Sequence, residues 1–576
     1  MADEQEIVAL EAQDSEPEIE ADEGPQTEPG AKRDERADRE DDAEAAGCPI
    51  RMGYGSGTPC GRKTHPAPDG VDEQPACLMH SRDPGKQSGG FFDEFRRVFE
   101  GILEEAGEGE AHFEGFVFPR LDFSVREFKA ICLFTRATFK QGANFGGATF
   151  TQYADFSGAT FAQNANFRGA TFSRNAHFRR ATFTLDADFS GATFTLDAAF
   201  REAAFTRDAD FHKATFRQVA GFEGSAFMQD ADFAWATFTL DANFPRATFT
   251  QVANFRRATF KQYANFPRAT FTQKPAFGWA TFHGLADWRD SRFLDQAEFR
   301  HTVFKPSQEG RPSAVFSFAK FAKPNEVVFD DVDLSRALFH SCDVSELWFT
   351  PSVEWGKRRG SHGLAVFEEL AADGVAKEYG FQNNGQRDYR SIAQVYQQLK
   401  KNYDARLDYW TANEFHFGEM EMKRLAGPTG GSLLSVRCWL HRNLSFLNGY
   451  RIFSSYGNSY SRPAWLLLLF VLAAALAFPI PGLVSATDKC RSDKSAAGCT
   501  FRYSWGTKDT RTNNLWTEAK LIGKSAITAV DTATFQRNSE YTPAYPWGRV
   551  LAILETLLTS TLFALFLLAI RRQFKR

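Results

Sequence analysis

A repeat of eleven residues fills the middle of this chain and constrains its fold more than any other feature. Between Phe134 and Phe304, phenylalanine recurs at steps that alternate between six and five residues, with Trp288 in one of these positions. The unit reads A-[DN]-F-x-x-A-T-F-x-x-x, as in the segment from Ala154 to Asn164. So short and regular a period predicts stacked structural units rather than a single globular core.

The spacing within each unit favours strands over helices. Ala and Phe lie two residues apart with Asp, Asn or Thr between them, which is the alternation of a short strand with its apolar residues inward. Gly, Asp and Asn recur at the corners between these triplets. Four such sides close a coil of about 22 residues, and successive coils stack at about 4.8 Å. Phe can fill the centre because the preceding inward residue is Ala.

The unit A-[DN]-F-x-x resembles the A(D/N)LXX unit of the pentapeptide-repeat family, with Phe at the central position. This resemblance implies a right-handed quadrilateral β-helix. Alternate sides here carry one extra residue, and plain five-residue steps return at Phe118, Phe123 and Phe128 and again between Phe329 and Phe349. Residues 113–350 are therefore predicted to form one rod. The expected fold class is mainly β, followed by an α-helical membrane module.

Charge divides the chain before the rod begins. Residues 1–46 contain 18 Asp and Glu against four Lys and Arg, so the remaining residues carry a net charge of about +9 within a total of −5. Such an acidic tail with few large apolar residues is predicted to be disordered. It contains no signal-peptide pattern, which predicts a cytosolic N-terminus.

The other expected segments are a Cys/His-rich segment at 47–90, a capping helix at 91–112, an irregular linker at 351–387, a helical hairpin at 388–426, a juxtamembrane segment at 427–462 and a membrane module at 463–576.

Three cysteines and one histidine suggest a structural metal site before the rod. Cys48, Cys60, Cys77 and His80 lie in a segment rich in Gly and Pro, and His65 is a possible substitute ligand. Thiols in a reducing cytosol hold Zn²⁺ more often than they form disulfides, and four ligands would close the coordination shell. The alternative is that these are scattered thiols in a linker.

The predicted hairpin follows the rod. The pattern after Asp388, as N-cap, places apolar residues at helical spacing, and a second helix is expected from Trp410 to Leu425 with Thr411 as its cap. Glu414, Glu419 and Glu421 lie beside His416 and are interpreted as a solvated helix face rather than as a metal or acid–base site.

Two apolar segments predict a membrane anchor. Residues 464–484 contain no charged side chain, and residues 550–570 contain only Glu555. Each is long enough to cross a hydrocarbon core of about 30 Å. With a cytosolic start, two spans place the loop 485–549 outside and both termini in the cytoplasm of an inner (plasma) membrane protein. Cys490 and Cys499, which lie in that loop, would then form a disulfide.

The last sixty residues resemble the two-transmembrane pore module of the potassium-channel family. Residues 515–529 would be the pore helix, and Thr528, Asp531 and Thr532 would lie at the filter position. The glycines of the family's filter are absent, so potassium selectivity is not expected. Glu555 is the intramembrane candidate, facing either protein or the wetted interface.

These features predict a membrane-tethered sensor or adaptor rather than an enzyme, because triads, phosphate loops and paired carboxylates are absent from the sequence. The rod would bind a protein partner, and the lipid-embedded module would respond, as a homo-oligomer if it forms a pore. The alternative is a structural scaffold that the spans only anchor. Residues 134–304 carry 19 Lys and Arg against 15 Asp and Glu, which disfavours an acidic, gyrase-binding DNA mimic and gives little ground for nucleic-acid binding.

Overall fold

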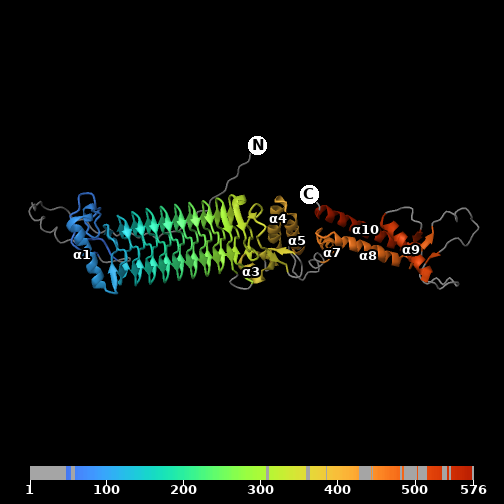
Figure 1. The fold of residues 1–576 in the computed structure, drawn as a ribbon, viewed down its shortest axis with the longest axis horizontal. Coiled ribbons are helices and arrows are strands. Elements are labelled where there is room, and N and C mark those ends of the chain that lie inside the picture. The colour runs from blue at the N-terminus through green and yellow to red at the C-terminus, as the bar shows by residue number, and fades with distance from the viewer. Residues whose placement is uncertain are drawn as a thin grey trace, which may run out of the picture.

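The computed structural model shows an elongated molecule in which a β-helix is followed by two groups of helices (Figure 1). It describes residues 47–52, 59–305, 310–358, 363–383, 386–426, 443, 445–480, 483–485, 502–503, 515–534, 541–543 and 546–573. The β-helix makes up most of the described length. One helix covers its N-terminal end, a helical hairpin covers its C-terminal end, and the apolar C-terminal helices lie beyond that hairpin.

The β-helix has four sides, each a parallel sheet of very short strands. Most strands contain two residues, such as β10 (Ala165–Asn166) and β11 (Thr171–Phe172). In the regular part of the rod, each strand pairs with the strand 22 residues later, so that Ala165 faces Ala187 and Phe172 faces Phe194. The predicted four-sided coil of 22 residues is therefore confirmed. The four sheets run from β1 (Glu110–His112) to β39 (Ala337–Leu338), from β2 (Val117–Phe118) to β37 (Lys320–Phe321), from β3 (Glu127–Phe128) to β35 (Val303–Phe304) and from β6 (Ala143–Asn144) to β40 (Trp348–Phe349).

Columns of stacked phenylalanine rings fill the interior. The Phe156 ring lies 4.8 Å from Phe134 and 4.9 Å from Phe178 in the coils on either side, with interplanar angles of 8° and 3°. Within the coil, the same ring meets Phe145 edge-on at 5.7 Å. The inward alanines leave room for these rings, and burying each Phe contributes about 2–3 kcal/mol. Cys132 is also buried in this core, as expected for a packed thiol.

Helices close both ends of the β-helix. At the N-terminal end, α1 (Gly89–Ala106) follows the short η2 (Pro84–Gln87) and buries Phe95 and Phe99 against the rings of the first coils. At the C-terminal end, α4 (Tyr389–Ala405) and α5 (Tyr409–Leu425) form the hairpin. Asp388 caps α4 as predicted, but the cap of α5 is Asp408, which accepts a hydrogen bond from the Thr411 amide.

The segment predicted to be an irregular linker contains regular structure. Its elements are β41 (Gly356–Lys357), β42 (Leu364–Ala365), α2 (Phe367–Leu370), α3 (Asp373–Glu378), β43 (Gln382–Asn383) and β44 (Gln386–Arg387), with η3 (Pro324–Glu326) and β38 (Val327–Asp330) in the last coils before it. Two of its antiparallel pairs, β41 with β42 and β43 with β44, are hairpins between residues close in sequence. This segment packs between the last coil and the α4–α5 hairpin.

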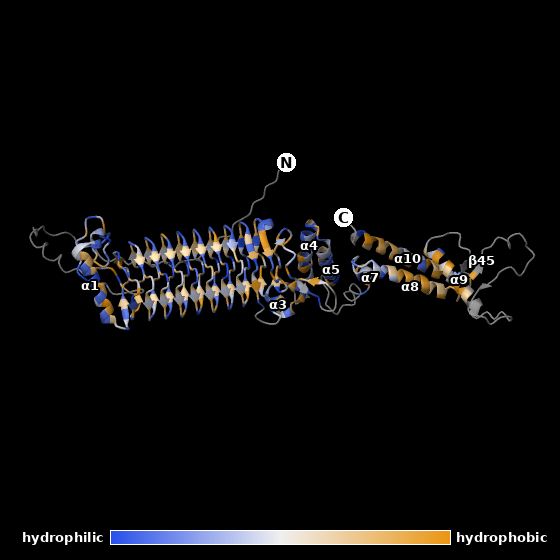
Figure 2. Ribbon diagram, in the orientation of Figure 1, coloured by the Kyte–Doolittle hydropathy of each residue, from blue (hydrophilic) through white to orange (hydrophobic). Residues whose placement is uncertain are grey.

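The C-terminal region contains α7 (Phe446–Ser454), α8 (Ser461–Ala477), α9 (Leu515–Ala533) and α10 (Pro546–Gln573). A small antiparallel sheet of β45 (Leu483–Ser485), β46 (Arg502–Tyr503) and β47 (Tyr541–Pro543) lies near α9. Figure 2 shows apolar ribbon along α8 and α10. Both helices leave large apolar side chains exposed, including Trp465, Leu469, Ile553 and Leu557.

Only one described helix, over Pro546–Arg571, is long and apolar enough to cross a membrane. The expectation of a second complete span at 464–484 is not supported, because α8 ends at Ala477. Its 17 residues correspond to about 25 Å, which is short of a hydrocarbon core of about 30 Å. Pro479 explains the early end, since proline has no amide proton to donate and its ring clashes with the preceding turn. Hydropathy treats this proline as one more residue of the apolar segment, so the pattern predicts a span that is longer than the helix.

Candidate functional site

The structure brings together the four predicted metal ligands. The ligand atoms of Cys48, Cys60, Cys77 and His80 all lie within 4.8 Å of one another. The distance from Cys60 Sγ to Cys77 Sγ is 3.8 Å, and His80 Nδ1 lies 3.2 Å from Cys77 Sγ and 3.6 Å from Cys48 Sγ. A tetrahedral zinc ion with Zn–S distances of about 2.3 Å separates its ligand atoms by about 3.8 Å. The cluster therefore has the size and the donor set of a closed structural metal site.

Surrounding groups fix the orientation of these ligands. His80 Nε2 lies 3.0 Å from the Glu114 carbonyl oxygen, so the proton sits on that nitrogen and Nδ1 is left to face the thiols. Arg62 donates a hydrogen bond to Cys60 Sγ at 3.4 Å. A hydrogen bond from the Cys77 thiol lowers the pKa of Cys60 and raises that of Cys77. A bound metal would replace this shared proton, because cysteines bind metals as thiolates.

The proposed substitute ligand His65 lies outside this cluster. Its Nε2 pairs with Asp83 Oδ2 at 2.9 Å, and both side chains are buried. The hydrogen bond from His65, with one from the Gly85 amide, lowers the pKa of Asp83. This pair anchors the loop that carries the ligands rather than supplying a further one.

The cluster is attached directly to the end of the rod. The His80 ring packs edge-on against Phe116 at 5.2 Å, and the Val117 amide donates to the Met79 carbonyl oxygen at 2.8 Å. Lys86, which the sequence did not single out, is fully buried and donates to the Leu78 carbonyl oxygen at 3.0 Å. Burial lowers the pKa of Lys86 to about 7. A metal held here would fasten the loop that covers the first coil.

Polar side chains fasten the hairpin to the opposite end. Asn402 donates hydrogen bonds to the carbonyl oxygens of Val344 and Leu347 at 2.8 and 2.7 Å, and Arg406 donates to Phe349 at 2.7 Å. These bonds satisfy backbone groups that the last coil would otherwise expose. Glu368 performs the same role on another side, where it accepts a hydrogen bond from the Phe339 amide at 2.6 Å.

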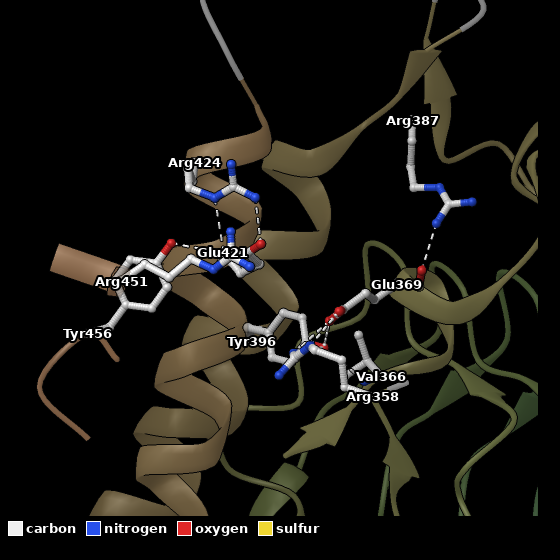
Figure 3. Close-up of polar contacts among 9 residues, drawn as sticks. All are labelled: Arg358, Val366, Glu369, Arg387, Tyr396, Glu421, Arg424, Arg451 and Tyr456. Carbon is white, nitrogen blue, oxygen red and sulfur yellow. Dashed lines mark hydrogen bonds and ion pairs between the residues drawn. The ribbon is translucent and has the colours of Figure 1, made fainter. Parts of the chain in front are cut away.

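A buried ion pair holds the linker against the hairpin (Figure 3). Arg358 contacts both carboxylate oxygens of Glu369, at 2.6 and 2.7 Å, and the Tyr396 hydroxyl of α4 also donates to this carboxylate. The Val366 amide donates to the Tyr396 hydroxyl at 3.1 Å, and Arg387 donates to the Glu369 carbonyl oxygen. Both members of the ion pair are nearly buried, so the geometry of this cluster is strongly constrained.

Glu421 joins the hairpin to the C-terminal helices (Figure 3). Its carboxylate accepts hydrogen bonds from Arg424 of α5 at 2.6 Å and from the Tyr456 hydroxyl at 2.9 Å, and it lies 3.8 Å from Arg451 of α7. The Asn458 side chain adds a hydrogen bond to the Asn413 carbonyl oxygen at 2.9 Å. We call these contacts the Glu421 joint. They link the hairpin to the segment that precedes α8.

The interpretation of the α5 glutamates as a solvated face was wrong for Glu419 and for Glu421, whose partners are given above. Glu419 is buried and lies among Lys400, Lys423 and His416. Burial alone would raise its pKa, but hydrogen bonds from His416 and Lys423 outweigh that effect and lower the pKa of Glu419 to about 2. The partners come from α4 and α7 as well as α5, so charge spacing along one helix could not reveal them.

The residues expected at a pore filter lie on a helix. Thr528, Asp531 and Thr532 belong to α9, where Thr528 donates to the Lys524 carbonyl oxygen and Thr532 to that of Thr528. Glu555 on α10 is 5% exposed, and its carboxylate oxygens have no hydrogen-bond partner among the described residues. It faces protein, within a bundle in which α10 contacts both α8 and α9. Cys490 and Cys499 lie outside the described residues.

The rod surface carries charges of both signs. On one of its faces, a shallow polar depression of about 540 Å³ lies over Ala199 and Gly221, where neighbouring coils carry His177 and Asn243. Along the whole rod, corner residues adopt positive φ in successive coils, as glycine or as larger side chains. Stacked coils of this kind present long, nearly flat faces suited to contact with another protein.

Comparison with known proteins supports the fold assignment of the rod. Residues 127–171, 167–215 and 211–259 match a family described as "Pentapeptide repeats (9 copies)". No curated protein and no solved structure matches the chain, and no match supports the resemblance of the C-terminal region to a potassium-channel pore module. The matched residues are those whose Ala and Phe columns build the four-sided coil. Over residues 127–259 the rod is a pentapeptide-repeat β-helix, and the same four-sided coil continues on either side of these residues.

Proposed function

We propose that this chain is a membrane-anchored adaptor whose pentapeptide-repeat rod binds a protein partner. The observation that carries the proposal is the unbroken series of packed contacts from the rod to the apolar helices. Asn402 and Arg406 bind the last coil to the hairpin, and the Glu421 joint binds the hairpin to α7. A load or a partner on the rod would therefore act on the C-terminal helices through defined contacts.

The proposed setting is an inner (plasma) membrane with both termini in the cytoplasm and residues 485–549 outside. The length of α10 supports one crossing. The second crossing would be made by α8, which packs against α10 and would need the bilayer to thin locally because it is about 5 Å short. In an exported loop, Cys490 and Cys499 would form a disulfide. A zinc ion held by Cys48, Cys60, Cys77 and His80 would keep the far end of the rod closed.

Photocrosslinking in intact cells tests the adaptor role. A photoreactive residue replaces one exposed side chain on each of the four rod faces in otherwise full-length chain. One face should give a discrete protein adduct in the membrane fraction, while an equivalent residue at the buried Phe200 position serves as the unreactive control. The absence of an adduct from all four faces would contradict the proposal.

A second experiment tests the topology. Single cysteines are placed at residues 2, 520 and 575 and treated with a reagent that cannot cross the membrane. Only the cysteine at residue 520 should react in intact cells.

A second candidate function, an oligomeric pore, rests on Glu555. A carboxylate that is buried in an apolar bundle without a partner is costly, and such groups usually face a polar pathway or another subunit. Ion flux into liposomes containing the purified full chain tests this function. Flux that Glu555→Gln reduces would support a pore. A flux equal to that of protein-free liposomes would leave the anchor as the role of these helices.

A further inference from the structure

One corner of the rod carries a row of large side chains in its membrane-proximal half. Lys213, Trp235, Arg257, Trp279 and His301 lie 22 residues apart and so occupy the same corner of five successive coils. We call this row the corner ladder. In the three preceding coils the same corner holds Gly147, Gly169 and Gly191. The next corner also carries basic residues at positive φ, such as Arg180 and Arg246, but between Arg136 and Asp290 it holds no aromatic residue.

The side chains of the corner ladder stack on one another. The Arg257 guanidinium lies 4.7 Å from the Trp235 ring centroid and 5.6 Å from that of Trp279. The His301 ring stacks on Trp279 at 4.9 Å with an interplanar angle of 27°. The two indoles remain 49% and 47% exposed. The result is an apolar edge with a planar cation fixed between two aromatic rings.

These residues pay a conformational cost that the fold does not require. Their φ angles lie between 53° and 61°, in the left-handed region that glycine adopts freely. For a bulky residue this conformation costs about 1–2 kcal/mol. Glycine at the same corner of the earlier coils shows that the β-helix closes without these side chains. The same strain occurs on the next corner, at Arg246 for example, so it is the pair of exposed, stacked indoles that points to a contact made outside the rod.

The charge beside the corner ladder favours a negatively charged occupant. No ion pair to a described carboxylate is formed by Arg257 or Lys213. Arg256 and Arg300 are exposed at the adjacent corner position of alternate coils. The carboxylate of Glu298, which pairs with Arg256 at 2.8 Å, is also shared by Lys274 at 3.1 Å. His301 pairs with Asp331 at 2.9 Å, which leaves Arg257 and Lys213 as the cations of the corner ladder without an ion pair to a described carboxylate.

We propose that the acidic N-terminal segment of this chain, residues 1–46, docks along the corner ladder. The segment carries a net charge of −14, and its Ile7, Val8 and Leu10 lie among acidic residues, which matches an edge of indoles and guanidinium groups. The distance along the rod to the far end of the ladder can be counted in coils. The sheet beside the ladder has eight steps from β3 to β35, which amount to about 38 Å. For the disordered segment that the sequence predicts, 46 residues give an end-to-end distance of about 34–40 Å, which is enough to reach the ladder. This inference does not depend on the proposed function.

Photocrosslinking within the full chain tests the docking. A photoreactive residue replaces Leu10, the purified chain in lipid nanodiscs is irradiated, and the adduct is mapped by mass spectrometry. We expect the adduct on peptides that contain Trp235 or Trp279, at a yield independent of protein concentration. The yield should fall several-fold between about 50 mM and about 300 mM salt, because screening weakens contacts between exposed charges.

Matched variants separate the corner ladder from general basicity. Arg257→Glu should lower the yield about fivefold, since an attraction becomes a repulsion. Arg246→Glu makes the same change at a residue with the same backbone conformation on the next corner, and should leave the yield unchanged. Trp279→Gly keeps the corner geometry found at Gly191 and should also lower the yield, which guards against misfolding of the charge variant.

Three results would overturn the proposal. The first is an adduct that maps to residues away from the corner ladder. The second is an equal loss of yield in Arg257→Glu and Arg246→Glu. The third is a yield that rises with protein concentration, which would assign the contact to a second copy of the chain.

Discussion

The two ends of the β-helix solve the same problem by different means. Each end of a stack of parallel strands exposes unpaired backbone groups that invite association with other strands. At the N-terminal end, α1 covers the first coil with Phe95 and Phe99, and the Cys/His cluster holds the adjoining loop. At the C-terminal end, Asn402, Arg406 and Glu368 bond directly to backbone groups of the last coils.

This difference shows where each end draws its stability. The loop at the N-terminal end is rich in Gly and Pro and has little regular structure, so a metal bound at the four ligands would have a large effect on it. The hairpin at the C-terminal end is a packed helical unit with buried side chains, such as Tyr396 and Phe415. If the cluster holds a metal, the N-terminal end depends largely on that one site, whereas the C-terminal end depends on many bonds distributed over α2, α4 and the last coil.

Loss of the metal ligands should produce the largest effect, and at one end only. We expect Cys77→Ser to abolish bound zinc and to destabilise residues 47–118 by several kcal/mol, on the order of the binding energy of a structural zinc. Metal analysis and hydrogen exchange on the full chain measure the two effects. Exchange in α4 and α5 should not change.

Cys132→Ser is the matched control for this prediction. It makes the same chemical change in a buried thiol of the rod that lies outside the cluster. It should leave the metal content unchanged while destabilising the second coil. Equal metal content in wild type and Cys77→Ser would show that the cluster holds no metal.

Ionisation of Glu368 should produce the next largest effect, at the C-terminal end. Burial raises the pKa of Glu368 to about 7 from an ordinary value of 4.5. Because the folded-state pKa is the higher one, the stabilisation is complete below about pH 4.5 and is lost as the pH rises through about 7. The loss amounts to about 3 kcal/mol, from 1.36 kcal/mol per pKa unit.

Exchange of α2 and the last coil between about pH 5 and about pH 8 measures this loss. Glu368→Gln should remove the dependence, since the amide remains neutral throughout. Glu346→Gln, at a side chain that is 60% exposed in the same region, is the control and should retain it. A dependence that persists in Glu368→Gln would assign the titration to another group.

A smaller effect is expected from close packing in the hairpin. A Cβ at Gly418 of α5 would overlap with the Tyr396 ring of α4. Gly418→Ala should therefore destabilise the C-terminal end by about 1–3 kcal/mol through overpacking. Gly374→Ala on α3, where a Cβ meets open space, should be neutral or slightly stabilising. Thermal unfolding followed by circular dichroism, with exchange in α4, distinguishes the two, and equal effects would contradict the packing argument.

The rod could be predicted from sequence because every coil repeats the same local solution. Ala and Phe two residues apart specify a strand, and the 22-residue sum of four sides specifies the coil. The ligands of the cluster could be predicted from residue type alone, because cysteines and a histidine in a segment with few apolar residues indicate a metal site. The partner of His65 was not predictable, because Asp83 reaches it only through the fold of that loop.

Features that depend on packing between distant segments could not be predicted from the sequence. The positions of Glu419 and Glu421 are decided by Lys400 and Arg451, which lie on other helices. The end of α8 depends on a single proline inside an apolar run. The corner ladder was visible in principle, since writing the chain in rows of 22 residues aligns Trp235, Arg257 and Trp279 in one column.

The smallest effect should come from the middle of the rod and should reach neither end. Arg246 adopts φ of 57° at an exposed corner, and Arg246→Gly removes this strain at the cost of extra freedom in the unfolded chain. We expect a gain of about 1 kcal/mol or less, measured by exchange of the strands in coils around Phe244. Trp235→Gly relieves the same strain but loses the stacking on Arg257, so it should not stabilise the rod.

Exchange at both ends should be unchanged in these two variants, because each coil contacts only its neighbours. A change that spread to α1 or α4 would mean that the rod unfolds as one cooperative unit. In that case the two ends would share a single stability, and the contrast between the end with the Cys/His cluster and the hydrogen-bonded end would disappear from every equilibrium measurement.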